Sequence, residues 1–164
     1  MAVITFVRLP VAALRALVAE DLEAASAAAG VPLSAWIQGE KWLWELRLGD
    51  VERDPAAAEW VARVAVADGR VVGHGGFHGP PDGEGRVEVG YSVDPAYRRR
   101  GFARAMLAEL IRRAEGDPRV RVVRASIRPD NAASLATIAG FGFARVGEQW
   151  DEVDGLETIY ERAV

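Results

Sequence analysis

The sequence predicts a single α/β domain built on a mixed β-sheet. The chain has 164 residues, which is the usual size of one domain. Half of its residues are hydrophobic and 27% are charged, as in ordinary globular proteins. Segments with strand and helix patterns interleave without alternating strictly, in the order β-α-α-β-β-β-α-β-α-β-β. We therefore assign residues 1–164 to one domain.

The N-terminal part is expected to hold one strand followed by helices. Ala2–Val7 is rich in β-forming residues. Pro10 suits a helix start, and the alanine-rich segment Val11–Ala29 has helical apolar spacing until Gly30 ends it. A tryptophan-containing stretch follows, helical in whole or in part, and Asp54-Pro55 marks a second helix start.

Three strands are expected in the middle of the chain. Trp60–Ala67 and Arg70–Phe77 are two β runs separated by Asp68-Gly69, which predicts a type I′ hairpin. The glycine- and proline-rich segment Gly79–Gly85 predicts a loop. Arg86–Val93 alternates apolar and polar residues, so we expect a third strand with one face buried.

The C-terminal part alternates helices and strands before a final hairpin. Gly101–Glu115 carries an apolar stripe at helical spacing, and Val120–Ile127 is a β run. Ala132–Ala139 is expected to be a short helix, and Phe143–Trp150 pairs with Leu156–Arg162 across an acidic turn. The apolar stripe consists of Phe102, Met106, Leu107, Leu110 and Ile111.

Composition excludes several classes of function. The chain has no cysteine, which excludes disulfides, cysteine-ligated zinc, iron–sulfur clusters and a thiol nucleophile. The formal net charge of −4 argues against a nucleic-acid partner. No apolar run is long enough for a membrane span, and Met1–Val7 lacks the pattern of a signal peptide, so we expect a cytoplasmic protein. The two histidines are isolated, and we expect no metal.

A basic segment interrupts this acidic chain between Arg86 and Arg128. Within it, a strand runs through Asp94-Pro95 directly into a helix, with the pattern Arg98-x-x-Gly101-x-Ala103 at the joint. The first turn of a helix presents amide groups without internal acceptors, and small residues let a diphosphate approach them. An ordinary strand–loop–helix joint with a solvated basic face explains the short pattern too.

The two motifs around this joint resemble those of the GCN5-related N-acetyltransferase (GNAT) superfamily. Val87–Met106 resembles motif A, and Ser126–Ser134 followed by Gly142-Phe143 resembles motif B, most closely in the ribosomal-protein N-terminal acetyltransferase branch. The resemblance covers about Trp60 to Arg162. It implies a mixed, mostly antiparallel sheet of about seven strands flanked by about four helices.

The resemblance also implies a binding site for acetyl-CoA as co-substrate. Val93 would pair with the pantetheine arm and offer its N–H to the thioester oxygen, and Asn131 would contact the same arm, although a helix N-cap explains that asparagine equally well. The joint itself would hold the diphosphate by main chain and guanidinium groups. Its residues are Arg98, Arg99, Arg100, Gly101, Phe102, Ala103 and Arg104.

The implied reaction is direct acetyl transfer to a primary amine within a ternary complex. A protonated amine must first lose a proton to a base, and two carboxylates compete for this role. Glu148, six residues after Gly142, matches the position of a proposed base in the ribosomal-protein branch. Glu88 lies on the motif A strand and faces the same side as Gly90 and Ser92 by strand alternation. Ser134 is expected to donate to the leaving thiolate.

The acceptor remains open at this stage. A small-molecule amine and a peptide N-terminus both fit, as does an acyl group longer than acetyl, and exposed strand edges leave a homodimer open. Trp36, Trp42 and Trp44 precede the sheet, where this fold shapes its acceptor pocket, but they also suit a core. The alternative function is a non-catalytic acyl-CoA-binding sensor, which would keep Gly101 and the arginines and lack a working base.

Overall fold

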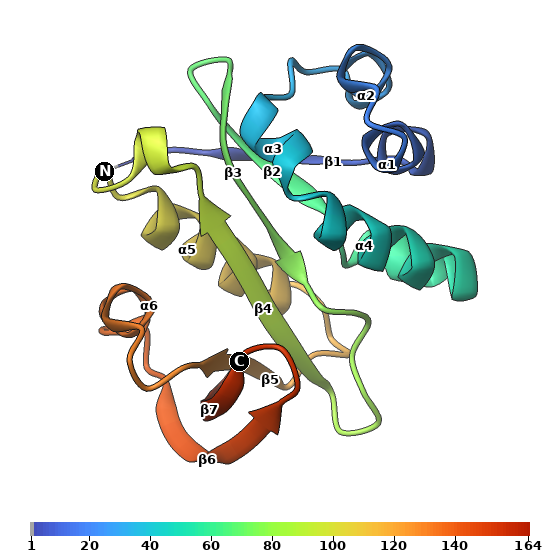
Figure 1. Ribbon diagram of the computed structural model, residues 1–164. Helices are drawn as coiled ribbons and strands as arrows, with labels where there is room; N and C mark the ends of the chain where they lie inside the picture. Colours follow the sequence, from blue (N-terminus) through green and yellow to red (C-terminus); the bar gives the residue numbers. More distant parts are fainter. Residues whose placement is uncertain (1) are drawn as a thin grey trace.

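A computed structural model describes residues 2–164; Met1, the first residue of the predicted domain, lies outside the described residues. Seven strands form one sheet in the order β1-β2-β3-β4-β5-β7-β6 (Figure 1). The strands are β1 (Thr5–Arg8), β2 (Arg63–Ala67), β3 (Arg70–Phe77), β4 (Arg86–Val93), β5 (Val122–Ile127), β6 (Ala144–Asp151) and β7 (Gly155–Ala163). The helices are α1 (Val11–Val18), α2 (Leu22–Ala29), α3 (Ala35–Gly39), α4 (Lys41–Arg53), α5 (Phe102–Glu115) and α6 (Ala132–Ile138), with 3₁₀ turns η1 (Pro55–Glu59) and η2 (Pro95–Tyr97).

The sheet is mixed and mostly antiparallel, as predicted. Every neighbouring pair is antiparallel except β4 and β5, which run parallel. The turn between β2 and β3 has Asp68 at φ 49° and Gly69 at φ 74°. Both central residues therefore have the positive φ that a type I′ hairpin requires, which confirms that prediction.

The number of helices was predicted wrongly. Residues 2–164 contain six α-helices instead of about four, because the segment Val11–Ala29 forms two helices and the tryptophan-containing stretch forms two more, α3 and α4. Glu20 takes a left-handed φ of 59°, and the Asp21 side chain accepts a hydrogen bond from the Ala24 N–H at 3.0 Å, which starts a new helix. Asp54-Pro55 likewise opens only the short turn η1.

Helix α5 packs its predicted apolar stripe against the sheet. Met106, Leu107 and Leu110 are fully buried on its inner face, against β3 and β4. The opposite face of the sheet is covered over β3 by α3 and α4, since His74 stacks on Trp36 and meets the edge of Trp44. None of the helices among residues 2–164 is long and apolar enough to cross a membrane.

Candidate active site

The central feature of the site is a gap between the parallel strands β4 and β5. The two strands pair at only three positions, from Arg86–Val122 to Glu88–Arg124. Beyond Glu88, strand β4 continues to Val93 and keeps pairing with β3 alone. The edge of β4 from Val89 to Val93 therefore has no strand partner toward β5 and borders an opening in the sheet.

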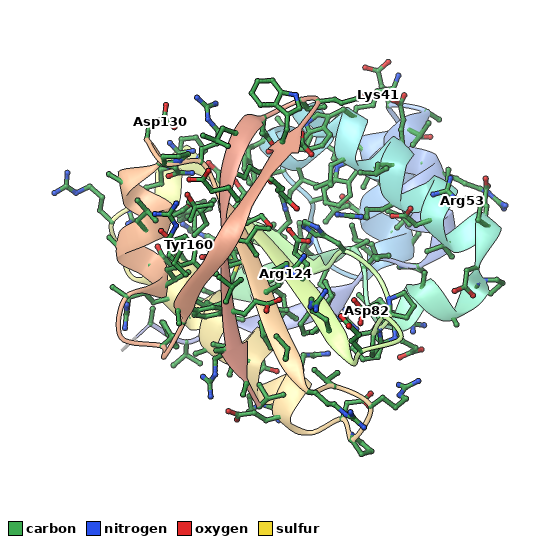
Figure 2. All side chains as sticks on the ribbon, turned by 90° about the horizontal axis from the view of Figure 1, so that it is seen from below. Lys41, Arg53, Asp82, Arg124, Asp130 and Tyr160 are labelled. Atoms are coloured by element: carbon green, nitrogen blue, oxygen red, sulfur yellow. The ribbon has the colours of Figure 1, made fainter. Side chains whose placement is uncertain are left out.

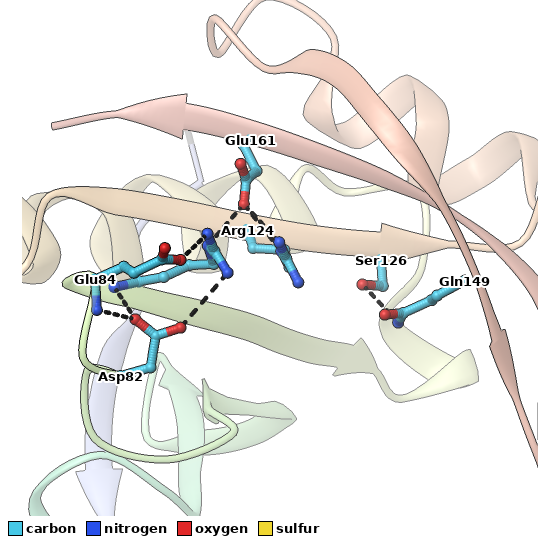
Figure 3. A network of polar contacts seen from close by, with 7 residues as sticks. Asp82, Glu84, Arg124, Ser126, Gln149 and Glu161 are labelled. Atoms are coloured by element: carbon cyan, nitrogen blue, oxygen red, sulfur yellow. Dashed lines mark hydrogen bonds and ion pairs between the residues drawn. The ribbon is translucent and has the colours of Figure 1, made fainter.

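A charged network holds the closed end of this gap. The Glu161 carboxylate on β7 lies 2.9 Å from Arg86 Nε on β4 and 2.9 Å from a terminal guanidinium nitrogen of Arg124 on β5 (Figure 3). Arg86 also reaches Asp82 and Glu84 in the preceding loop. One carboxylate thus joins three strands at the point where β4 and β5 still pair.

The loop after β4 turns sharply into α5. Asp94 caps the turn η2 by accepting a hydrogen bond from the Ala96 N–H at 2.9 Å. Arg99 and Gly101 both have left-handed backbones, with φ 63° and φ 84°. Gly101 is the N-cap of α5, so glycine is favoured there by its conformation as well as by the room it leaves for an anion.

The start of α5 presents several free amide groups. The first described backbone hydrogen bond of the helix runs from the Ala105 N–H to the Gly101 carbonyl at 3.1 Å. Among the described residues, none accepts a hydrogen bond from the N–H groups of residues 100–104. A turn with this many unsatisfied donors is suited to bind phosphate oxygens.

The four arginines of the joint have different surroundings. Arg98 donates from Nε to the Val93 carbonyl at 3.3 Å, and Arg100 lies over the Tyr97 ring. The Arg104 guanidinium is engaged elsewhere: it donates to the carbonyls of Thr137 and Ala139 at 3.0 and 2.9 Å, and lies over the ring of Phe141. Arg104 therefore ties α5 to the end of α6 in this structure.

Asn131 acts as the N-cap of α6. Its Oδ1 accepts a hydrogen bond from the Ser134 N–H at 3.0 Å. This is the structural role that the sequence allowed as an alternative, and it leaves the Nδ2 group without a hydrogen-bond acceptor among the described residues. Ser134 itself lies on the first turn of α6, where its side chain contributes to the wall of the cavity described next.

A cavity of about 1070 Å³ extends from the β4–β5 gap to α4. Its walls come from α4, from β3 and β4 on one side of the gap, and from β5, α6 and the β6–β7 hairpin on the other. Lys41 and Arg53 mark the two ends of α4 in Figure 2, on the opposite side of Arg124 from Asp130 at the start of α6. Four of the lining acids come from the sheet or its last turn: Glu88, Asp151, Asp154 and Glu157.

The two predicted base candidates lie in different places. Glu88 lines the cavity, as do the four residues that follow it, and the burial of Val87 and Val89 is the alternation expected of a strand with one buried face. Glu148 is absent from the cavity wall among the described residues; its carboxylate is half exposed and pairs with Arg145 at 2.5 Å.

A β-bulge explains the position of Glu148. Arg145 opposes Tyr160 and Gly147 opposes Ile159, so Val146 is an extra residue on β6. One inserted residue turns every later side chain of a strand to the other face. Gln149, not Glu148, consequently points into the cavity.

Glu88 has a histidine beside it. His78 Nδ1 lies 3.7 Å from the Glu88 carboxylate, and the imidazole rests on Gly90, where an added Cβ would come within 2.7 Å of Nε2. Burial lowers the pKa of His78, and the nearby Arg47 lowers it further, whereas the charges of Glu88 and Asp50 oppose this. These surroundings favour the neutral imidazole over the protonated one.

Sequence reasoning missed two further groups of the cavity. Glu157 on β7 is 9% exposed and accepts a hydrogen bond from Gln149 Nε2 at 2.9 Å. Glu40, at the start of α4, lies 3.4 Å from His74 Nε2, and this hydrogen bond lowers the pKa of the Glu40 carboxyl. Both residues are separated from the motifs in the sequence, so no local pattern marked them.

The tryptophans divide between the core and the cavity. Trp44 is fully buried, and its Nε1 donates to the Ile37 carbonyl at 2.6 Å. Trp42 is 61% exposed and lies at the cavity wall with Leu46 and Val153. The cavity therefore combines apolar surface with carboxylates, which suits a cationic molecule that also carries apolar groups.

Comparison with known proteins agrees with this geometry. The sequence model described as "Acetyltransferase (GNAT) family" matches residues 15–143. The chain is 33% identical over 73 residues to the uncharacterized N-acetyltransferase YjdG of Bacillus subtilis, and 47% identical over 55 residues to the N-alpha-acetyltransferase RimI of Mycobacterium tuberculosis. These alignments cover 44% and 34% of this chain and 44% and 32% of the two relatives, so less than half of either curated relative is matched.

A solved structure shares the whole fold. The microcin C7 self-immunity acetyltransferase MccE, in complex with acetyl-CoA and AMP, has a TM-score of 0.68 at 16% identity, over 98% of this chain and 92% of that chain. At this identity the likeness shows the fold alone, and it includes the seven-stranded mixed sheet. The family match extends over most of the chain and includes motif A. The chain belongs to the acetyltransferase (GNAT) family.

Proposed function

We propose that this protein is an N-acetyltransferase that transfers an acetyl group from acetyl-CoA directly to a primary amine. The observation that carries the proposal is spatial: the gap beside β4 borders the acid-lined cavity, and β4 leads directly into the turn of free amides at Gly101. The family assignment and the acetyl-CoA complex of MccE support the choice of co-substrate.

The residues around the gap would hold acetyl-CoA in a defined direction. The N–H groups from Arg100 to Arg104 would receive the diphosphate, with Arg98, Arg99 and Arg100 supplying positive charge. Phe102 and Ala103 shape that first turn. Val93 would pair with the pantetheine arm along the open edge of β4, and Asn131 would reach it through its free Nδ2 group. Acetyl-CoA supplies the activated thioester carbonyl.

Two predicted catalytic residues line the cavity, and we assign them opposite proton steps. Glu88 takes part in removing a proton from the cationic amine, either directly or as a relay to water, because only the neutral amine can attack the thioester carbon. Ser134 donates a hydrogen bond or proton to the departing thiolate. Glu148 has no part in this assignment, since its carboxylate lies outside the cavity wall.

The acidic wall favours a cationic acceptor, and two classes fit it. A peptide N-terminus is supported by the printed name of the RimI relative, an N-alpha-acetyltransferase. A small-molecule amine is the other class, because the cavity is wide enough for a compact ligand. The cavity does not by itself separate these classes.

Two measurements test the proposal. Acetyl-CoA should raise the melting temperature, and at one hundred times its dissociation constant it should add about 2.7 kcal/mol of stability. Thiol release should then appear with at least one member of a panel of peptide N-termini and small-molecule amines. No thermal shift at millimolar acetyl-CoA would reject the co-substrate; a shift without transfer to any amine would favour the acyl-CoA sensor instead.

A further inference from the structure

A buried carboxylate on β7 faces the cavity and has no role so far. Glu157 is 9% exposed, and ionised carboxylates are seldom buried to this extent without a basic partner. Among the described residues, no lysine or arginine forms an ion pair with it. Its burial costs folding free energy when it is charged, so a functional reason for it is expected.

The position of Glu157 is fixed through Gln149. The Gln149 Nε2 group donates to Glu157 Oε2 at 2.9 Å and to Ser126 Oγ at 3.2 Å. This amide therefore joins β7, β6 and β5, and Figure 3 shows the Gln149–Ser126 part of the contact. Glu157 Oε1 accepts no hydrogen bond from the described residues, so it is free to receive a proton from a ligand in the cavity.

The surroundings of Glu157 favour the protonated carboxyl. Burial raises its pKa, the hydrogen bond from Gln149 opposes this, and the negative charges of Asp151, Asp154 and Glu88 raise the pKa further. Asp151 and Asp154 come from the β6–β7 turn and Glu88 from β4 across the gap. A carboxylate with increased proton affinity is a better acceptor for an ammonium proton than an ordinary one.

We propose that Glu157 is the general base of the transfer and that Glu88 carries the proton onward to solvent. The inference rests on the function proposed above and assigns its first proton step to a residue outside both motifs. Glu157 is deeply buried, whereas the Glu88 side chain is 27% exposed and borders the same cavity. The more buried group meets the amine, and the more exposed group connects it to water.

The protons balance as follows. The ammonium group loses one proton to Glu157, and the neutral nitrogen forms a bond to the thioester carbon while the carbon–sulfur bond breaks. The nitrogen then loses a second proton, which ends on the coenzyme A sulfur through Ser134. The proton held by Glu157 passes to Glu88 and then to water, which restores the starting carboxylate.

The main test compares two glutamine variants. Glu157→Gln should lower kcat about 100-fold or more and leave KM for acetyl-CoA unchanged, as expected when a general base is removed. Glu148→Gln makes the same chemical change on the outer face of the same hairpin and should stay within twofold of wild type. Retention of more than a third of the kcat by Glu157→Gln would overturn the proposal.

The pH dependence supplies a readout that a structural role would not move. The loss of kcat in Glu157→Gln should become smaller as pH rises, because a larger fraction of the amine is then already deprotonated. In Glu88→Gln, removal of one negative charge should lower the pKa of Glu157, so the acidic limb of kcat/KM should move to lower pH. An acidic limb of kcat/KM at the same pH in Glu88→Gln as in wild type would contradict the electrostatic coupling between Glu88 and Glu157.

A stability measurement checks that Glu157→Gln is folded. Because the pKa of Glu157 is raised on folding, ionising it costs stability at pH values above that pKa. Glu157→Gln should therefore melt at a higher temperature than wild type at pH 8, and the difference should shrink as pH falls through the pKa of Glu157. A variant that is less stable at pH 8 would show that the carboxylate serves the fold instead.

The outcomes separate this inference from the proposed function. If the wild-type protein binds acetyl-CoA and transfers to no amine, the proposed function fails. If the wild type transfers and Glu157→Gln transfers equally well, only the assignment of Glu157 fails.

Discussion

The two ends of the β4–β5 pair are built from the same two strands, but the strands are paired at one end and unpaired at the other. At one end, Arg86–Glu88 pairs with Val122–Arg124, and Glu161 holds an arginine from each strand. At the other end, Val89–Val93 has no partner toward β5, and the chain turns into free amides at Gly101. The closed end holds the two strands together, and the open end leaves one edge of β4 unpaired.

The largest expected effect is at the open end. Gly101→Asp places a side chain and a negative charge among the free amides, and should weaken acetyl-CoA binding at least 100-fold and abolish the thermal shift of about 2.7 kcal/mol. Gly30→Asp is the matched control, because Gly30 also has a positive φ of 73° and lies at the end of α2. Normal binding by Gly101→Asp would place the diphosphate elsewhere.

The next effect is at the closed end. Glu161→Gln leaves Arg86 and Arg124 without their shared carboxylate and should lower the free energy of unfolding by about 2 kcal/mol, since both ion pairs are partly buried and Arg124 is also hydrogen-bonded to Glu161. Glu84→Gln removes an exposed partner of the same Arg86 and should cost less than about 0.5 kcal/mol. Urea denaturation measures both. Equal losses of unfolding free energy in the two variants would mean that Glu161 contributes no more to stability than an exposed partner of Arg86.

A smaller effect is expected beside the open edge. Gly90→Ala should push the His78 imidazole away from Glu88, because the new Cβ would lie 2.7 Å from Nε2. We expect kcat to fall about three- to tenfold, a barrier increase of about 1 kcal/mol, with KM for acetyl-CoA unchanged. Gly79→Ala is the control, since an added Cβ there meets nothing within 4 Å. Identical kinetics in the two variants would show that His78 does not orient Glu88.

Local features of the site were predictable and long-range ones were not. The strand, the turn at Gly101 and the apolar stripe of α5 lie within about thirty consecutive residues, so spacing alone indicated them. The hairpin at Asp68-Gly69 is local for the same reason. The split of Val11–Ala29 was missed because alanine favours helix throughout, and the break at Glu20 and Asp21 depends on a cap and a left-handed residue.

The sequence by itself determined the family, the turn at Gly101 that starts α5 and the side of β4 on which Glu88 lies, because each depends on neighbouring residues with fixed periodicity. Only the tertiary structure decided which carboxylates meet in the cavity. The bulge at Val146 turns Glu148 outward and Gln149 inward, and strand pairing brings Glu157 beside Gln149. A single extra residue reverses the faces of a strand, so a count of positions along the chain cannot place these side chains.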